Sequence, residues 1–466
     1  MRIRLFGHYL HLPLIGLVLV EFTAFVASMY AAVALRFGMD NVRAVANLGP
    51  LFSRSLLFSG ACLISFMALG LYTTRQRAGL SGVMLRVVIA IPAAVAAVAA
   101  LFYLMPAFEI GRGVVAIAAV LATVSAFIIR IISTRVTYLQ VMKRRVLVLG
   151  ETEQMEAFKR MRRRSDRVGY QLVGVVHQDG DNVQPLGETV YTAPRGLKAL
   201  CQELNIDELV VAIRDRRQSF PVKELLECRM AGITVVEFIS FMERETGRIQ
   251  LDLLNPSWII FGPGFARDGL RLFTARALDF VASAVLVLFS LPIMLLAMLA
   301  IWLEDGRKGG GVLYRQNRVG YEGKVFALTK FRSMRVNAEA GGAQWAQTND
   351  PRVTRVGAFM RKTRIDELPQ LFNVLAGHMG FVGPRPERPE FVTKLEENIP
   401  YYAYRHSVKP GLTGWAQLCY PYGSSIDDAK RKLEYDLYYV KHHNLVFDLT
   451  IILQTVEVVV MGKGAR

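Results

Sequence analysis

The chain has 466 residues, more than a single hydrophobic core usually organises, so two or three domains are expected. Hydrophobic residues make up 52% of the chain, which excludes a disordered, a collagen-like or a wholly soluble chain. The formal net charge is +17. Apolar bias and positive charge together favour an anionic membrane surface over nucleic acid as the partner. The four cysteines, Cys62, Cys201, Cys228 and Cys419, lack CxxC spacing, so neither a disulfide framework nor a zinc site is indicated.

The first 140 residues carry four runs of about 20 apolar residues, the length that a membrane-crossing helix needs. They are Leu12 to Leu35, Leu56 to Tyr72, Val83 to Leu104 and Gly113 to Ile132. The first run has no cleavage-site pattern and is followed by three more, so we interpret it as a retained helix rather than a signal peptide. The sequence thus predicts a four-helix transmembrane domain over residues 1–140.

Basic residues set the expected orientation of these spans, because loops on the cytoplasmic side carry more lysine and arginine. Arg2 and Arg4 precede the first span, and a dense basic stretch follows the fourth, from Arg135 to Arg164. Both ends of the domain, and everything after it, are therefore expected in the cytoplasm. Glu21 within the first span is open to a functional role, but a carboxylate packed between helices is the simpler interpretation.

From residue 141 the pattern changes to short buried strands that alternate with helices. Strand-like runs occur at 146–150, 170–176, 208–213 and 233–238, and helical patterns at 197–204 and 222–230. This alternation predicts a parallel sheet in a Rossmann-like α/β domain over residues 141–265.

The turn after the first of these strands, residues 150–156, does not fit a dinucleotide site. It lacks the glycines that let a backbone approach a pyrophosphate, and Glu151 and Glu153 place negative charge there. A structural or regulatory module is therefore favoured, and no cofactor is expected in this domain.

A further apolar run covers residues 278–303 and has Pro292 near its middle. It is long enough to span, but proline removes a backbone hydrogen bond and kinks a helix, and Ser290 can satisfy freed backbone groups. If the run spanned, the charged C-terminal part would leave the cytoplasm. We therefore expect a helix that enters the membrane, breaks at Ser290–Pro292 and returns to the same side; a kinked fifth span is the alternative.

The last two hundred residues combine arginine and lysine with glycine and proline turns. The segments are QNRVG (316–320), KFRSM (330–334), DPRVTRVG (350–357), RKTRIDELPQ (361–370), GPRPE (383–387) and KPGLTGWAQ (409–417). Arginines held beside such turns are suited to clamping a diphosphate in a bidentate manner. Any one of them alone is more readily explained as a surface charge, but the set together indicates a phosphate site.

Asp366 and Glu367 stand next to each other inside the fourth of these segments. Neighbouring residues on a helix point about 100° apart, so both can reach one small site at a helix end. One carboxylate can attack phosphorus and form an acyl-phosphate, while the other holds Mg²⁺, which prefers oxygen ligands. A lone acidic pair more often marks a helix N-terminus, but the surrounding arginines favour a catalytic site.

The C-terminal part resembles the bacterial sugar transferase family, monotopic phosphoglycosyltransferases that begin glycan assembly on a polyprenol phosphate. The resemblance rests on QNRVG, KFRSM, DPRVTRVGAFMRKTRIDELPQLFNVLAG, VGPRPERPEF, KPGLTGWAQ and YDLYYV, in the family's order, over residues 270–466. It implies a mostly helical, monotopic catalytic domain over residues 266–466, with a re-entrant helix at 278–303. The four spans and the α/β module ahead of it resemble the large, exopolysaccharide-initiating members.

The resemblance also implies a reaction. Asp366 would be the nucleophile, which attacks the β-phosphorus of a UDP-sugar, expels UMP and holds the phospho-sugar until undecaprenyl phosphate accepts it. Glu367, together with Asp366, matches the Mg²⁺ position. The implied substrate contacts are Arg318, Lys330, Arg332, Arg361, Pro384, Arg385 and Pro386, and the implied membrane break is Ser290 and Pro292. The expected location is the bacterial inner membrane, with the catalytic domain on the cytoplasmic face and UDP-glucose or UDP-galactose as the donor.

Two positions depart from the family pattern. Leu291 separates Ser290 from the helix-breaking proline, and His378 stands where the family usually has aspartate. We expect His378 to be a local hydrogen-bonding residue rather than a catalytic one.

Two other interpretations remain. A membrane-attached nucleotide-sugar dehydratase needs a glycine fingerprint and a Tyr-x-x-x-Lys pair, and none of the 17 tyrosines has lysine four residues later. A non-enzymatic scaffold of polysaccharide export gives no reason for Asp366, Glu367 and the arginine set to occur together.

The lipid bilayer is an implied partner, and an α/β module without a ligand of its own offers a contact for a homodimer.

Overall fold

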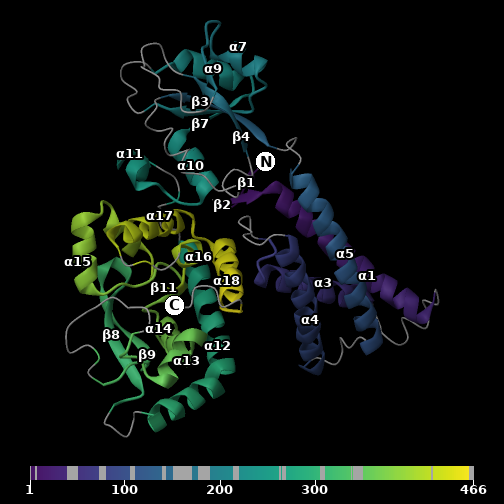
Figure 1. The fold of residues 1–466 in the computed structure, drawn as a ribbon, viewed down its shortest axis with the longest axis vertical. Helices are drawn as coiled ribbons and strands as arrows, with labels where there is room; N and C mark the ends of the chain where they lie inside the picture. The colour runs from purple at the N-terminus through teal and green to yellow at the C-terminus, as the bar shows by residue number, and fades with distance from the viewer. Residues whose placement is uncertain are drawn as a thin grey trace. The chain divides into compact units, whose positions relative to one another are not determined.

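The chain forms two compact units, each described here by itself. The computed structural model describes residues 2–5, 8–38, 51–72, 80–104, 111–138, 143–150, 170–176, 189–213, 220–254, 256–261, 264, 269–304, 310–336, 338, 350–420, 423 and 425–460. The first unit holds the described residues up to Gly247 apart from His8, and the second begins at Arg248. Figure 1 draws the elements of both.

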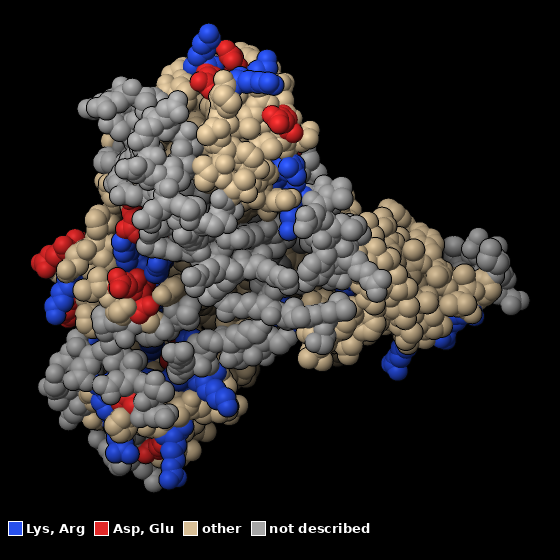
Figure 2. Space-filling model, turned by 45° about the horizontal axis from the view of Figure 1, so that its top comes forward, with Lys and Arg blue, Asp and Glu red and all other residues tan. Residues whose placement is uncertain are grey.

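The first unit begins with helices built from the four apolar runs. They are α1 (Leu12–Phe37), α3 (Leu51–Ala68), α4 (Leu80–Leu104) and α5 (Arg112–Tyr138), preceded by the paired strands β1 (Arg2–Leu5) and β2 (His8–His11). Helix α1 packs against α3 and α5, and α4 packs against the same two. All four are long and apolar enough to cross a membrane. In Figure 2 the lobe on the right, which these helices form, shows few charged side chains.

An ion pair lies buried among these helices. The Arg130 Nε atom is 2.7 Å from Glu21 Oε1, and Arg130 Nη2 donates to Glu21 Oε2 at 3.0 Å. Arg130 Nη1 donates to the Leu71 carbonyl at 2.7 Å, and the Tyr72 hydroxyl also donates to Glu21. A buried carboxylate needs such donors in place of water. The interpretation of Glu21 as a carboxylate packed between helices is therefore confirmed.

The rest of this unit is a five-stranded parallel sheet in the order β5-β4-β3-β6-β7. Its strands are β3 (Arg144–Gly150), β4 (Tyr170–Val176), β5 (Val190–Tyr191), β6 (Glu208–Ala212) and β7 (Thr234–Glu237), and its helices are α7 (Leu197–Glu203), α9 (Val222–Met230) and α10 (Phe238–Thr246). Counted from the first strand, the order is 3-2-1-4-5, which is the doubly wound order 3-2-1-4-5-6 without its sixth strand. The predicted parallel sheet with helices is thus confirmed. The turn predicted at 151–156 lies outside the described residues.

The second unit is mostly helical in the part that the structure describes. Its helices are α11 (Pro256–Phe261), α12 (Gly269–Glu304), α13 (Arg355–Thr363), α14 (Gln370–Leu375), α15 (Pro389–Asn398), α16 (Trp415–Cys419), α17 (Ile426–His442) and α18 (Leu445–Val460). Strands β8 (Leu313–Val319) and β9 (Val325–Phe331) pair antiparallel, and β10 (Gly380–Val382) and β11 (Gly411–Thr413) pair in parallel. The 3₁₀ turns are η4 (Leu251–Leu253), η6 (Tyr321–Gly323), η7 (Ile365–Glu367) and η8 (Tyr402–Ser407).

Helix α12 contains the apolar run expected to enter the membrane and is longer than predicted. It begins at Gly269 and continues through Ser290 and Pro292 to Glu304 as one helix, although Figure 1 shows its direction changing between its two halves. The sequence predicts that Ser290 serves freed backbone groups. In the structure its hydroxyl instead donates to Met294 Sδ, at 3.6 Å, because the following turn brings that sulfur within reach.

Residues near both ends of α12 make hydrogen bonds to other elements of the second unit. Near its start, Arg276 donates to the last two carbonyls of α14, each at 2.7 Å, and Asp279 accepts from the Phe381 N–H at 2.6 Å. At its end, Glu304 accepts from the first two N–H groups of α13, at 2.9 and 3.0 Å. Between these contacts many apolar side chains are exposed, such as Phe289 at 75%. The helix is therefore fixed near both ends, while much of the apolar surface between these contacts stays exposed.

Helix α18 packs one face against the unit and exposes the other. Phe447, Asp448 and Ile451 are buried, whereas Leu445 and Leu449 are exposed. Apolar residues therefore lie on both the packed and the exposed face of this helix, and the acidic Asp448 lies on the packed face.

We expect Asp448→Asn to stabilise the protein at pH 8 but not at pH 4. Burial raises the pKa of Asp448 to about 7, and repulsion from Asp279 adds to this. The folded state therefore holds a proton that the unfolded state releases near pH 4, so stability falls as the pH rises from about 4 to 7. Asparagine keeps an oxygen for the Tyr439 hydroxyl, which donates to Asp448 at 2.8 Å, and has no charge to bury.

At pH 8 the free energy of unfolding of Asp448→Asn is expected to exceed that of the wild type by a few kcal/mol, since one pKa unit corresponds to about 1.4 kcal/mol. Thermal unfolding in lipid nanodiscs at both pH values measures it. The exposed Asp427, changed to asparagine, is the matched control. Equal pH dependence of the wild type and Asp448→Asn contradicts the prediction.

Candidate functional site

Helix α13 ends in a turn that presents two carboxylates. Thr354 caps the start of the helix by accepting from the Gly357 N–H at 2.9 Å. Arg364 ends it with a left-handed backbone, φ 61°, which is unusual for a residue with a side chain and is typical of sites under constraint. The chain then forms η7, which contains Asp366 and Glu367. The left-handed residue therefore places both acids in one short turn directly after the helix.

Glu367 lies at the centre of a cluster of cations. Its Oε1 atom is 2.9 Å from Arg385 Nη2, 3.3 Å from Lys330 Nζ and 3.8 Å from Arg364 Nη1. Burial raises the pKa of Glu367, but these three cations, Arg385 first, outweigh burial and hold the pKa well below its usual range. Glu367 is therefore ionised at neutral pH and serves as the shared counter-ion.

Asp366 has a different environment, although it is the next residue. Its side chain is buried, and the described residues give its carboxylate no hydrogen bond or ion pair. Burial raises the pKa of Asp366, and the charge of Glu367 adds to this; Lys330, Arg361 and Arg364 act in the opposite direction and do not outweigh it. Paired acids whose pKa values are pushed apart are typical of sites in which the two have different roles.

Lys330 and Arg361 reach this turn from two elements. Lys330 extends from β9, and burial lowers its pKa while Glu367 counteracts the shift. Arg361 extends from the last turn of α13, and its Nε donates to Ser333 Oγ at 2.9 Å, a contact that restricts its orientation. Both cations act on the pKa of Asp366. A strand and a helix thus place positive charge beside the buried acid.

The β10–β11 pair holds the loop formed by residues 384–386. Directly after β10, a Cβ on Gly383 would lie 2.2 Å from the carbonyl oxygen of Lys409, which precedes β11, so this position requires glycine. Close backbone packing of this kind fixes where the following loop leaves the sheet.

Arg385 extends from this loop to the acid pair. One arm of its guanidinium contacts Glu367, and the other, Nη1, donates to Gln417 Oε1 at 3.3 Å. Arg318 from β8 donates to the Pro386 carbonyl of the same loop at 3.0 Å. Arg318 therefore supports the loop backbone, and Arg385 is the loop's cation in the site.

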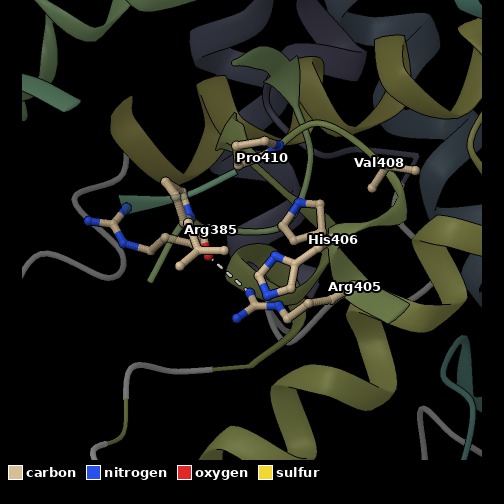
Figure 3. A pocket seen from close by; sticks show the side chains of 8 residues that line it. Arg385, Arg405, His406, Val408 and Pro410 are labelled. Carbon is tan, nitrogen blue, oxygen red and sulfur yellow. Dashed lines mark hydrogen bonds between the residues drawn. The ribbon is translucent and has the colours of Figure 1, made fainter. Parts of the chain in front are cut away.

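A small pocket opens beside the loop (Figure 3). It is lined by Val319, Pro384, Arg385, Pro386, Arg405, His406, Val408 and Pro410. Burial, together with the charge of Arg405, lowers the pKa of His406 to about 4, so the imidazole is neutral at pH 7. The valines and prolines give apolar walls. The pocket therefore places a neutral ring and apolar surface next to Arg385.

The structure gathers most, but not all, of the predicted site residues. Asp366, Glu367, Lys330, Arg361 and Arg385 meet as described above. Arg332 does not join them in the described part of the chain. Its guanidinium lies against Gly310, where a Cβ would be 1.6 Å from Nη1. The expected contact of Arg332 with the phosphate site is thus unsupported.

Two residues of the cluster were not predicted as site residues. Arg364 contacts Glu367 and also ends α13, and Gln417 accepts from Arg385. In the sequence Arg364 is one of three cations among four consecutive residues, 361–364, and a left-handed backbone cannot be predicted from a residue other than glycine. Gln417 is the last residue of the segment KPGLTGWAQ, far along the chain from the acid pair. The segment was part of the predicted phosphate site, but Gln417 itself was not predicted as a site residue.

The two acids have oxygen atoms of the kind that Mg²⁺ prefers. Lys330, Arg364 and Arg385 all contact the Oε1 atom of Glu367. No cluster of three or more histidine, cysteine, aspartate or glutamate side chains suited to a metal occurs in the described ranges. Mg²⁺ is usually bound by one or two carboxylates together with substrate phosphates. The residues present therefore fit a cation that arrives with a phosphorylated substrate.

Fold and site together define a membrane-associated protein whose C-terminal unit presents a buried carboxylate among cations. The sequence model described as bacterial sugar transferase matches residues 270–462. A protein from Bacillus subtilis, provisionally named as an undecaprenyl-phosphate N-acetylgalactosaminyl 1-phosphate transferase, is 50% identical over 130 residues, which are 28% of this chain and 71% of that protein. The chain therefore belongs to the bacterial sugar transferase family.

Two larger relatives extend the similarity. The UDP-N-acetylgalactosamine-undecaprenyl-phosphate N-acetylgalactosaminephosphotransferase of Aeromonas hydrophila is 41% identical over 242 residues, 52% of this chain and 56% of the relative. The undecaprenyl-phosphate glucose phosphotransferase of Komagataeibacter xylinus is 31% identical over 353 residues, 73% of this chain and 64% of the relative. The matches thus span somewhat more than half of the length of these two relatives.

Proposed function

We propose that this protein transfers a phospho-sugar from a UDP-sugar to undecaprenyl phosphate, with Asp366 as the nucleophile. The observation that carries the proposal is the contrast between the two neighbouring acids. Glu367 is bound by three cations, whereas Asp366 is buried beside them with no described partner for its carboxylate. The names of the relatives, which specify transfer of sugar phosphates to the same lipid, support the substrate class.

The reaction proceeds in two displacements at one phosphorus. A carboxylate oxygen of Asp366 attacks the β-phosphorus of the UDP-sugar. The bond to the oxygen that bridges the two phosphates breaks, and UMP leaves with the electron pair. A phosphate oxygen of undecaprenyl phosphate then attacks the same phosphorus, which breaks the acyl-phosphate bond and regenerates the Asp366 carboxylate. One acid thus serves both steps, and the product is a polyprenyl-diphosphate sugar.

The cations around the acids neutralise negative charge during these steps. Lys330, Arg361 and Arg385 are held in place before substrate arrives, so little reorganisation is needed when charge moves onto the phosphate oxygens. Glu367 keeps the cations close together. Mg²⁺, held by Glu367 with Asp366, would supply further neutralisation of the diphosphate when bound. Arg385 also lines the pocket of Figure 3, which we propose as the place of the leaving nucleotide.

We also propose that α12 enters the membrane and returns to the cytoplasmic face. A straight helix of its length would measure about 54 Å, well beyond the ~30 Å of a hydrocarbon core, and a spanning helix would have its ends on opposite faces. The bonds of Arg276, Asp279 and Glu304 to one unit support the returning course. The exposed apolar side chains between them would face lipid, which would bring the lipid phosphate to the site.

A panel of donors tests the proposed function. The purified protein in nanodiscs with Mg²⁺ and undecaprenyl phosphate would be incubated with UDP-glucose, UDP-galactose and UDP-N-acetylgalactosamine in turn. We expect UMP release and a polyprenyl-diphosphate sugar with one of them. A folded protein that releases no UMP with any donor would contradict the proposal and favour a non-enzymatic scaffold.

A further inference from the structure

We propose that Arg405 and Asp436 are positioning residues that hold Arg385 in its place beside Glu367. The inference rests on the proposed function, because it concerns how the phosphate-binding arginine is oriented. Neither residue touches the acids. They act from behind the loop of residues 384–386, on its backbone.

Arg405 in η8 joins the loop to helix α17. Its Nη2 group donates to the Arg385 carbonyl at 2.9 Å, the bond drawn in Figure 3, and lies 2.8 Å from Asp436 Oδ2. Its Nη1 group donates to the Tyr402 hydroxyl. Arg405 and Asp436 are 6% and 2% exposed. The donor that fixes the Arg385 carbonyl is therefore itself fixed on two sides and shielded from water.

The contacts form a continuous series from α17 to the acid turn. Asp436 orients Arg405, Arg405 holds the backbone of Arg385, and the side chain of Arg385 contacts Glu367 at 2.9 Å. A small shift of the Arg385 backbone would be carried to the end of its long side chain. The geometry of the cation cluster thus depends on a bond made to the main chain on the opposite side of the loop.

Stability alone is a weak reason for this arrangement. A buried ion pair costs so much desolvation that apolar residues of similar size often stabilise a fold as well. What an apolar pair cannot supply is a directed donor for the Arg385 carbonyl. A guanidinium can donate to that carbonyl and to a carboxylate at once, whereas lysine has a single nitrogen and no planar fork.

Helix α17 offers a matched control two residues before Asp436. Glu434 is also 2% exposed, and Arg248 Nη1 lies 2.7 Å from its Oε2 atom. Glu434 additionally accepts from the Leu251 N–H. This pair joins α17 to the segment at 248–254 and has no described contact with the loop. Its carboxylate is therefore as buried as that of Asp436 and the pair has the same charges, without a described link to Arg385.

The test is a double-mutant cycle on kcat/KM for the UDP-sugar, measured in nanodiscs by UMP release. Asp436→Asn and Arg405→Lys would each be made in the wild type and in Arg385→Ala. We expect each to lower kcat/KM about 10-fold in the wild type and less than about 2-fold in Arg385→Ala, because a positioning residue has nothing left to position there. Glu434→Gln is expected to change kcat/KM by the same factor in the wild type and in Arg385→Ala.

Equal factors in both backgrounds for Asp436→Asn and Arg405→Lys would overturn the inference, since a purely structural pair acts independently of Arg385. Thermal unfolding of each variant is measured in parallel, and Arg405→Lys, which keeps the charge, carries the cycle if Asp436→Asn does not fold. A wild type that releases no UMP with any donor would instead overturn the proposed function, and the inference with it.

Discussion

Replacing Asp366 with asparagine is expected to lower the rate of UMP release by about 10⁴-fold or more. Asparagine has nearly the same shape but no carboxylate to attack phosphorus, and removal of a covalent nucleophile has effects of this order in other enzymes. The buried position of Asp366 and its lack of a described hydrogen bond indicate that the fold does not depend on its charge. Membrane insertion and thermal unfolding should therefore stay close to the wild type.

The control for this variant is Asp427→Asn, at an exposed position of α17, which should retain full turnover. Turnover in Asp366→Asn above about 1% of the wild-type rate would contradict the assignment of this residue, because catalysis by the remaining cations alone would then suffice.

Replacing Glu367 with glutamine is expected to lower kcat/KM by about 10²- to 10³-fold and to raise the Mg²⁺ concentration needed for half-maximal activity. The amide removes the charge that Lys330, Arg364 and Arg385 share, so three cations would be left close together without a counter-ion. It also removes a charged oxygen ligand, and Mg²⁺ prefers carboxylates. Initial rates measured over a range of Mg²⁺ concentrations separate the two effects.

Glu396→Gln, at an exposed position of α15, is the matched control and should match the wild type in both quantities. An unchanged Mg²⁺ requirement in Glu367→Gln would contradict the metal role. An unchanged kcat/KM would contradict the role of the whole cation cluster.

The sequence located the acid pair because the two residues are adjacent and lie in a motif with arginines. It also located Lys330 and Arg385, but it did not show that both contact the same oxygen of Glu367. That contact depends on the antiparallel pairing of β8 with β9 and the parallel pairing of β10 with β11. Strands of three residues, such as β10 and β11, are too short to give a periodic signal, so the position of the loop they hold was beyond prediction.

Other features depend on conformation or on contacts that are distant in the sequence. The left-handed backbone of Arg364 comes from the way α13 meets η7, and the identity of the residue does not predict it. Arg405 and Asp436 are 31 positions apart and meet only when η8 packs on α17. The apolar run of α12 was predicted, but the anchoring of both of its ends by Arg276 and Glu304 was not, because each bond joins segments far apart in the chain.

The most direct test of the account is a search for the covalent intermediate. The wild-type protein in nanodiscs would be mixed with its UDP-sugar and Mg²⁺ in the absence of undecaprenyl phosphate, quenched rapidly and examined for released UMP and for the mass of the peptide that contains Asp366. The account predicts a burst of about one UMP per protein molecule and a phospho-sugar on Asp366. Release of UMP only when the lipid acceptor is present, with no adduct on that residue, would contradict it.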